Sequence, residues 1–174
     1  RPTRASAGQA GSAGTSCYCA EVPLRIGIIG DTQGRFNVAA LLERVAGLFD
    51  GVDEVWHAGD WQYPEVLDGL ARIAPLTVVN GNAPDDPSYP EHVLRHVGEL
   101  RVGMVHRPPR PGDEWLKGLD ICIHGHTHKW RDEEIDGVRY INVSTPTAAG
   151  FSRERTCGML SIDGKSAQLE RIDL

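Results

Sequence analysis

The chain has 174 residues, of which 40% are hydrophobic and 24% are charged, and its formal net charge is −6. This length suits a single domain with a substantial apolar core, and the composition is that of a globular protein rather than a disordered or fibrous one. The negative charge provides no general basic field for a phosphate backbone, so we do not expect a nucleic-acid-binding protein. No apolar run approaches the roughly 20 residues that a membrane-spanning helix needs, so we expect no membrane segment.

The first part of the chain differs in composition from the rest. Residues 1–22 are small and polar, contain arginines, and have no acidic residue before Glu21. Such a composition is typical of a tail or linker. We therefore expect a tail over 1–22 and one folded domain over 23–174.

The cysteines show neither the CxxC spacing of a metal or redox motif nor the density of a disulfide-rich secreted protein. They are Cys17, Cys19, Cys122 and Cys157. We predict free thiols in a reducing compartment and hence a cytoplasmic protein.

From Leu24 onward, short apolar runs alternate with segments of helical periodicity. The first half reads as strand, helix, strand, helix and strand, which predicts a parallel sheet. These segments are 24–30, 36–49, 52–59, 64–73 and 75–81.

The second half is mostly strand-like and contains the hairpin signals Asp136-Gly137 and Asp163-Gly164. Together the two halves predict a mixed α/β sandwich of two sheets. The strand-like segments are 92–97, 100–106, 120–125, 130–135, 138–143, 156–162 and 167–174.

Polar side chains follow several predicted strands at the point where each strand ends. Open α/β sheets place their ligand sites at the carboxyl ends of strands. Oxygen donors from Asp and Asn combined with imidazoles suit Mn²⁺, Fe or Zn²⁺ better than Ca²⁺, and the set is large enough for two adjacent cations. The candidate ligands are Asp31, Gln33, Asp60, Asn82, His106, His126 and His128.

The blocks GDxx, GD, GN, H and GHTH, in this order from about Leu24 to the C-terminus, resemble the calcineurin-like metallophosphoesterase superfamily, especially its small bacterial phosphodiesterases. The resemblance implies a four-layer α/β/β/α sandwich of two mixed β-sheets with a di-metal centre. It also implies a divalent-metal-dependent phosphoesterase that acts on a small phosphate ester or nucleotide. We expect two Mn²⁺ ions, with Fe, Zn or Ni as alternatives.

Carried over position by position, the resemblance assigns ligands to each metal. Asp60 bridges the two ions, and Asp60, Asn82 and His106 are expected to be catalytic. Two cations about 3.5–4 Å apart can generate hydroxide near neutral pH and neutralise charge on a phosphoryl group. The first metal is assigned to Asp31, Gln33, Asp60 and His128, and the second to Asp60, Asn82, His106 and His126.

Three positions depart from the family pattern. Gln33 stands where His is usual; its amide oxygen is a weaker ligand than imidazole but acceptable for Mn²⁺, and some related enzymes also look like DxQ at this block, so we interpret Gln33 as a ligand. The sequence after Asn82 lacks the usual acid, which leaves leaving-group protonation unassigned. Arg107 replaces a usual Gly, and together with Arg110 it could clamp a phosphate at the rim of the site.

Several alternatives stay open from the sequence. Asp85 and Asp86 read as turn residues, although either could replace the missing acid. Trp61 and Trp130 could wall a nucleotide pocket or pack in the core. The alternative to an enzyme is an interaction scaffold, because the retromer subunit resembles the same phosphodiesterases in fold. A homo-oligomer is compatible with the sequence.

Overall fold

The computed structural model describes residues 22–147 and 154–174. Each helix and strand expected from the sequence is present, with bounds within about three residues of the prediction. The first half contains β1 (Leu24–Ile29), α1 (Val38–Leu48), β2 (Glu54–His57), α2 (Pro64–Leu70) and β3 (Leu76–Val78). The second half contains β4 (His92–Val97), β5 (Leu100–Val105), the 3-10 helix η1 (Glu114–Leu116), β6 (Ile121–His124), β7 (Trp130–Ile135), β8 (Val138–Val143), β9 (Thr156–Asp163) and β10 (Ser166–Asp173).

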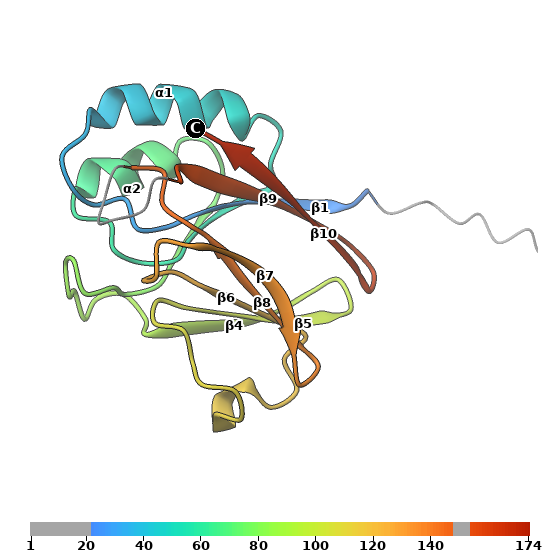
Figure 1. Cartoon of the computed structure of the whole chain (residues 1–174). Coiled ribbons are helices and arrows are strands. Elements are labelled where there is room, and N and C mark those ends of the chain that lie inside the picture. The colour runs from blue at the N-terminus through green and yellow to red at the C-terminus, as the bar shows by residue number, and fades with distance from the viewer. Residues whose placement is uncertain (1–21, 148–153) are drawn as a thin grey trace, which may run out of the picture.

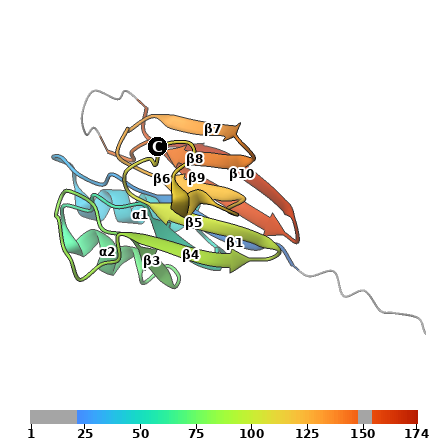
Figure 2. The same cartoon turned by 90° about the horizontal axis from the view of Figure 1, so that it is seen from below.

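The strands form two mixed sheets of five strands each. The first sheet has the order β10-β9-β1-β2-β3, in which β1, β2 and β3 are parallel and β9 pairs antiparallel with β1. The second has the order β4-β5-β6-β8-β7, with parallel β5, β6 and β8 flanked by antiparallel edge strands (Figure 2). The expected hairpin at Asp136-Gly137 joins β7 to β8, and both residues have positive φ.

The layers follow the expected order of a sandwich. Figure 1 shows α1 and α2 on the outer face of the first sheet, the second sheet against its inner face, and η1 beyond the second sheet. The predicted fold is therefore confirmed. Among the described residues, the fourth layer consists of the single turn η1, which the sequence analysis did not identify because one 3-10 turn has no helical period.

Successive side chains of β1 point to opposite faces of the first sheet, and each face packs against a different layer. Ile26 and Ile28 face the second sheet and are fully buried in the core between the sheets, whereas Ile29 packs with Phe49 in the core beneath the helices. Gly27 lies on the helix side, where a β-carbon would lie 2.7 Å from the Phe49 ring. One face of the first sheet thus packs against the second sheet, and the other packs against the helices.

Two further expectations concern the cysteines and the membrane. Cys122 and Cys157 are free and buried, and burial raises the pKa of each thiol to about 12. Cys17 and Cys19, with nearly all of the expected tail, lie outside the described residues. In the ranges that the structure describes, none of the helices has the length and apolar character to cross a lipid bilayer.

Candidate metal centre

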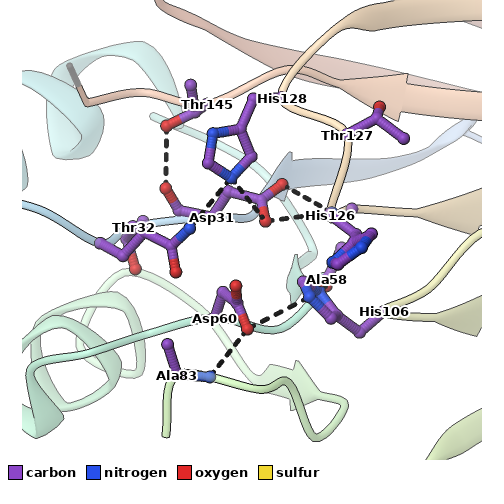
Figure 3. Close-up of polar contacts among 12 residues, drawn as sticks. Asp31, Thr32, Ala58, Asp60, Ala83, His106, His126, Thr127, His128 and Thr145 are labelled. Carbon is purple, nitrogen blue, oxygen red and sulfur yellow. Dashed lines mark hydrogen bonds and ion pairs between the residues drawn. The ribbon is translucent and has the colours of Figure 1, made fainter. Parts of the chain in front are cut away.

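The predicted ligands lie in loops that follow β1, β2, β3, β5 and β6. Both sheets contribute, and Figure 3 shows that side chains from these loops point toward one another. The loops after β1 and β6 bring Asp31 next to His126 and His128, while those after β2 and β5 bring Asp60 next to His106. The order of the strands therefore brings residues that are distant in the sequence into one cluster.

Four of the predicted ligands have a left-handed backbone conformation. Asp31, Asp60, His126 and His128 have φ values of 53°, 58°, 69° and 55°. This region is sparsely populated by residues other than glycine, although Asp and His are among those that tolerate it. Gly81 allows the loop after β3 to approach Asp60 closely, because a β-carbon there would overlap the backbone nitrogen and carboxylate of Asp60.

Asp60, Asn82 and His106 form what we call the Asp60 end of the centre. The Asp60 carboxylate is buried, and its Oδ1 accepts hydrogen bonds from the backbone nitrogens of Asn82 at 2.6 Å and Ala83 at 3.0 Å. Burial acts to raise the pKa of Asp60, but contact with His106 and the two backbone donors lowers it overall. The group is therefore a carboxylate, held by the main chain.

The ring of His106 has one satisfied nitrogen and one that faces an acceptor. Its Nδ1 lies 2.9 Å from the carbonyl oxygen of Ala58 and donates to it, so in the neutral ring Nε2 carries the lone pair. This Nε2 is buried without a hydrogen-bond donor and lies 3.1 Å from Asp60 Oδ1. Two buried acceptors at that distance require a cation, and the donor set fits a divalent metal.

In the absence of a metal, a proton meets this requirement. Burial acts to lower the pKa of His106, but the neighbouring Asp60 carboxylate raises it overall. The exposed His126 ring packs edge-on against His106, with centroids 5.2 Å apart. Burial and the positive charges of His106 and Arg107 lower the pKa of His126, which keeps that imidazole available as a neutral ligand.

Asp31, Gln33 and His128 form the Asp31 end. Asp31 is fully buried, and both of its carboxylate oxygens accept from the backbone nitrogen of His126 at 3.0 Å. His128 Nε2 lies 3.4 Å from Asp31 Oδ1. The side-chain Nε2 of half-buried Gln33 lies 3.0 Å from the same His128 nitrogen, so Gln33 lies beside this end through its amide nitrogen, and coordination of a metal by its amide oxygen stays a prediction.

The two ends are close enough to form one centre. Asp31, Asp60 and His106 each offer a ligand atom, and these atoms lie within 4.8 Å of one another. Gln33, Asn82, His126 and His128 surround this core through the contacts given above. The structure therefore brings together all seven residues that the sequence selected, around a candidate divalent-metal site.

Asn142, at the end of β8, was not identified as a site residue from the sequence. It is fully buried, and its Nδ2 donates to the carbonyl oxygen of Gly125 at 2.8 Å and lies 3.1 Å from Thr127 Oγ1. Its Oδ1 accepts from the backbone of Ser144, whose hydroxyl donates to the carbonyl oxygen of His128. Asn142 thus fixes the loop that carries His126 and His128, the two histidines predicted as ligands after β6. The signal was a polar residue in the apolar run VRYINV.

A cleft of about 250 Å³ opens beside the Asp60 end. Its lining includes Asn82, His106 and Arg107, so Arg107 lies at the rim as expected, whereas Arg110 is exposed further along and is not among the lining residues. The sequence left open whether Asp85 or Asp86 could replace the missing acid. Asp85 lines the cleft, whereas Asp86 accepts a hydrogen bond from the backbone nitrogen of Ser88 in a turn.

The remaining polar and aromatic candidates are structural. His57 and His124 are buried, and burial lowers the pKa of the first to about 3 and of the second to about 4. His57 Nε2 lies 3.0 Å from the hydroxyl of Thr32, which follows Asp31. Trp61 is buried edge-on against Tyr89, and Trp130 packs against the core between the sheets. Of the two alternatives for these tryptophans, packing in the core is the one that these contacts show.

Comparison with known proteins places this geometry in a family. Residues 24–165 match the calcineurin-like phosphoesterase superfamily domain. The chain belongs to this superfamily. A probable metallophosphoesterase of Methanothermobacter thermautotrophicus is 31% identical over 159 residues, which cover 84% of this chain and 91% of the relative.

Solved structures of similar fold include a vacuolar protein sorting protein and a phosphodiesterase. Vacuolar Protein Sorting 29 from Cryptosporidium parvum has a TM-score of 0.74 at 24% identity, covering 88% of this chain and 93% of that one. A novel archaeal phosphodiesterase has a TM-score of 0.67 at 20% identity, covering 85% of this chain and 99% of that one. At these identities the similarities establish the fold alone. The activity must be argued from the residues of the site.

Proposed function

We propose that this metallophosphoesterase hydrolyses a small phosphate ester or nucleotide with the help of two divalent metal ions. The observation that supports this most directly is the buried pair of acceptors formed by His106 Nε2 and Asp60 Oδ1, beside the Asp31 carboxylate. A cluster of this kind is unstable without a cation. Its donors are oxygen and imidazole nitrogen, which suit Mn²⁺, Fe, Ni or Zn²⁺.

The residues that would hold the metals follow the two ends of the centre. Gln33 and His128 would join Asp31 on one ion, Asn82, His106 and His126 would hold the other, and Asp60 would bridge them. When bound, such a pair supplies an activated water near neutral pH and neutralises charge on the phosphoryl oxygens.

The protein side chains orient the reactants. The bond from His106 Nδ1 to Ala58 fixes the ring orientation and its tautomer. The main-chain bonds to Asp60 hold its carboxylate in one position without a side-chain rearrangement. Arg107, exposed at the cleft rim next to His106, is positioned to bind phosphoryl oxygens through its guanidinium group.

The test is hydrolysis of bis-p-nitrophenyl phosphate with Mn²⁺, compared between wild type and Asp60→Asn. We expect metal-dependent activity in wild type and its loss in Asp60→Asn. The matched control is Asp50→Asn, because Asp50 is exposed beyond α1 and outside the centre. Equal rates in all three proteins would exclude this centre as the source of activity.

The second candidate function is an interaction scaffold. It is favoured by the fold similarity to Vacuolar Protein Sorting 29 and by Gln33, where imidazole would be the stronger ligand. A wild type without phosphoesterase activity that gains it as Gln33→His would support this candidate, since the fold and the other ligands would then be intact.

A further inference from the structure

A second cleft, lined by arginines, lies beside the loop that carries Gln33. It has a volume of about 410 Å³, and its lining includes Arg35, Arg44 and Arg155. We call it the arginine cleft. Among the described residues no Asp or Glu side chain lines it; the other polar contributions come from Asn37 and Thr147. In a chain with a net charge of −6, this is a local concentration of positive charge.

All three arginines of the cleft are exposed in the part of the chain that the structure describes. None of them forms an ion pair or a side-chain hydrogen bond with another described residue. In contrast, the guanidinium of Arg139 binds Asp132, and that of Arg171 binds Asp173. Three guanidinium groups line this cleft and no Asp or Glu side chain does, so an anion in the arginine cleft would be favourable.

The fold, rather than the local sequence, assembles this cleft. Arg44 follows Asn37 by seven residues, and with Ala40 and Leu41 these residues form one face of α1. Arg155 comes from the segment that leads into β9, and the backbone nitrogen of Leu174 is bonded to its carbonyl oxygen. The C-terminal Leu174 lines the same cleft as Ala40 and Leu41 of α1, and Figure 1 shows the C-terminus overlapping α1 in that view.

The arginine cleft is coupled to the metal centre through two neighbouring segments. Arg35 is two residues from Gln33, so their Cα atoms are within about 7 Å of each other. Thr147, which lines the cleft, donates its hydroxyl hydrogen to the carbonyl oxygen of Gln33 at 2.7 Å. Gln33 is therefore linked to a residue of the cleft through its carbonyl oxygen and to His128 of the metal centre through its side-chain amide.

We infer that the arginine cleft binds an anionic group of the substrate, and therefore that the substrate is a phosphate ester carrying a second anionic group, such as a further phosphate. This inference rests on the proposed function for the identity of the ligand as substrate. The anion-binding part stands on the cleft alone, so the two parts can be tested separately.

The first experiment measures binding of inorganic tripolyphosphate by calorimetry to the whole protein kept metal-free with a chelator. Binding should weaken by about tenfold in Arg44→Gln and in Arg155→Gln, because each removes charge-assisted hydrogen bonds. Arg72→Gln is the matched control, since Arg72 is exposed after α2 and does not line the cleft. Affinities that are equal in all variants, or no binding at all, would overturn the inference even if the protein is an active phosphoesterase.

The second experiment compares a dinucleoside diphosphate with the corresponding dinucleoside monophosphate as substrates at saturating Mn²⁺. We expect wild type to prefer the diphosphate, and Arg44→Gln or Arg155→Gln to lower the ratio of the two kcat/KM values by about tenfold, mainly through KM. If tripolyphosphate binding depends on the arginines but this ratio does not, the cleft binds an anion other than the substrate and the substrate assignment is wrong. A wild type inactive on both compounds contradicts the proposed function and the substrate assignment together, whereas the calorimetry still decides anion binding.

Discussion

The two ends of the metal centre are held in different ways. At the Asp60 end, two main-chain nitrogens bind the carboxylate, and the facing His106 nitrogen is buried. At the Asp31 end, the carboxylate is equally buried, but the histidine that faces it is half-buried and shares its Nε2 with the Gln33 amide. A metal at the Asp60 end would replace a proton on His106 but would find the carboxylate and the ring already held in position, whereas a metal at the Asp31 end must displace the contact between Gln33 and His128. We therefore expect tighter binding at the Asp60 end.

The largest effect should come from Asp60, because both ends depend on it as the proposed bridge. Asp60→Ala should lose both metals and lower kcat/KM for bis-p-nitrophenyl phosphate by about three orders of magnitude. The increase in Tm on adding Mn²⁺ should disappear with them, since a ligand stabilises only the protein that binds it. An Asp60→Ala protein that keeps its activity would remove the basis for a two-ion centre.

Removing one end should leave the other. Native mass spectrometry after Mn²⁺ loading should show two ions in wild type, taken up in two phases, and one ion in His128→Ala. Loss of both ions in His128→Ala would mean that the two ends bind cooperatively rather than unequally. A wild type that never exceeds one ion would mean that Gln33 does not support the first site.

A change at position 33 should make the two ends more alike. Gln33→His should raise the affinity of the weaker Mn²⁺ or Zn²⁺ site by about tenfold, because imidazole nitrogen is a stronger donor than an amide oxygen. Metal titration followed by kinetics at saturating metal measures this. If Gln33 instead binds substrate, metal affinity will stay constant and KM will rise.

The smallest effect is the pH dependence of the Asp60 end. The raised pKa of His106 adds stability to the metal-free protein that is full below the ordinary value of about 6.5 and is lost as the pH rises through the raised pKa. Metal must displace this proton, so the Tm increase caused by Mn²⁺ should grow with pH, by about 3–5 °C per unit, and level off above the raised pKa. Differential scanning calorimetry at several pH values measures both slopes, and metal-free His106→Gln is the control for the pH dependence of the metal-free protein. Parallel curves for the two proteins would show that another group titrates.

The strands and most of the site could be predicted because their signals are local. The apolar runs predict β1 to β10, and the residues that follow each parallel strand can be read from the sequence, so Asp31, Asp60 and His106 could be selected without a structure. The arrangement of the Asp31 end could not be, because the contact between Gln33 and His128 depends on how the two sheets align.

Features assembled from distant segments were also missed. Arg35 and Arg44 belong to a loop and a helix surface that resemble any solvated face, and only the packing of the chain end against α1 adds Arg155 to them. Asn142 lies in an apolar strand, and its importance depends on the loop after β6 passing over it. In each case the residue type is informative only once its neighbours are known.

The left-handed backbone of the ligands has a consequence for how the protein could be engineered. Each residue of this kind other than glycine lowers the free energy of unfolding by about 1 kcal/mol, and four of the proposed ligands share the conformation, in a domain whose total stability is typically about 5–15 kcal/mol. Glycine at the exposed His126 would relieve the strain there and remove a ligand in the same step. Selection for thermal stability of the metal-free protein and selection for catalysis therefore act on the same positions in opposite directions.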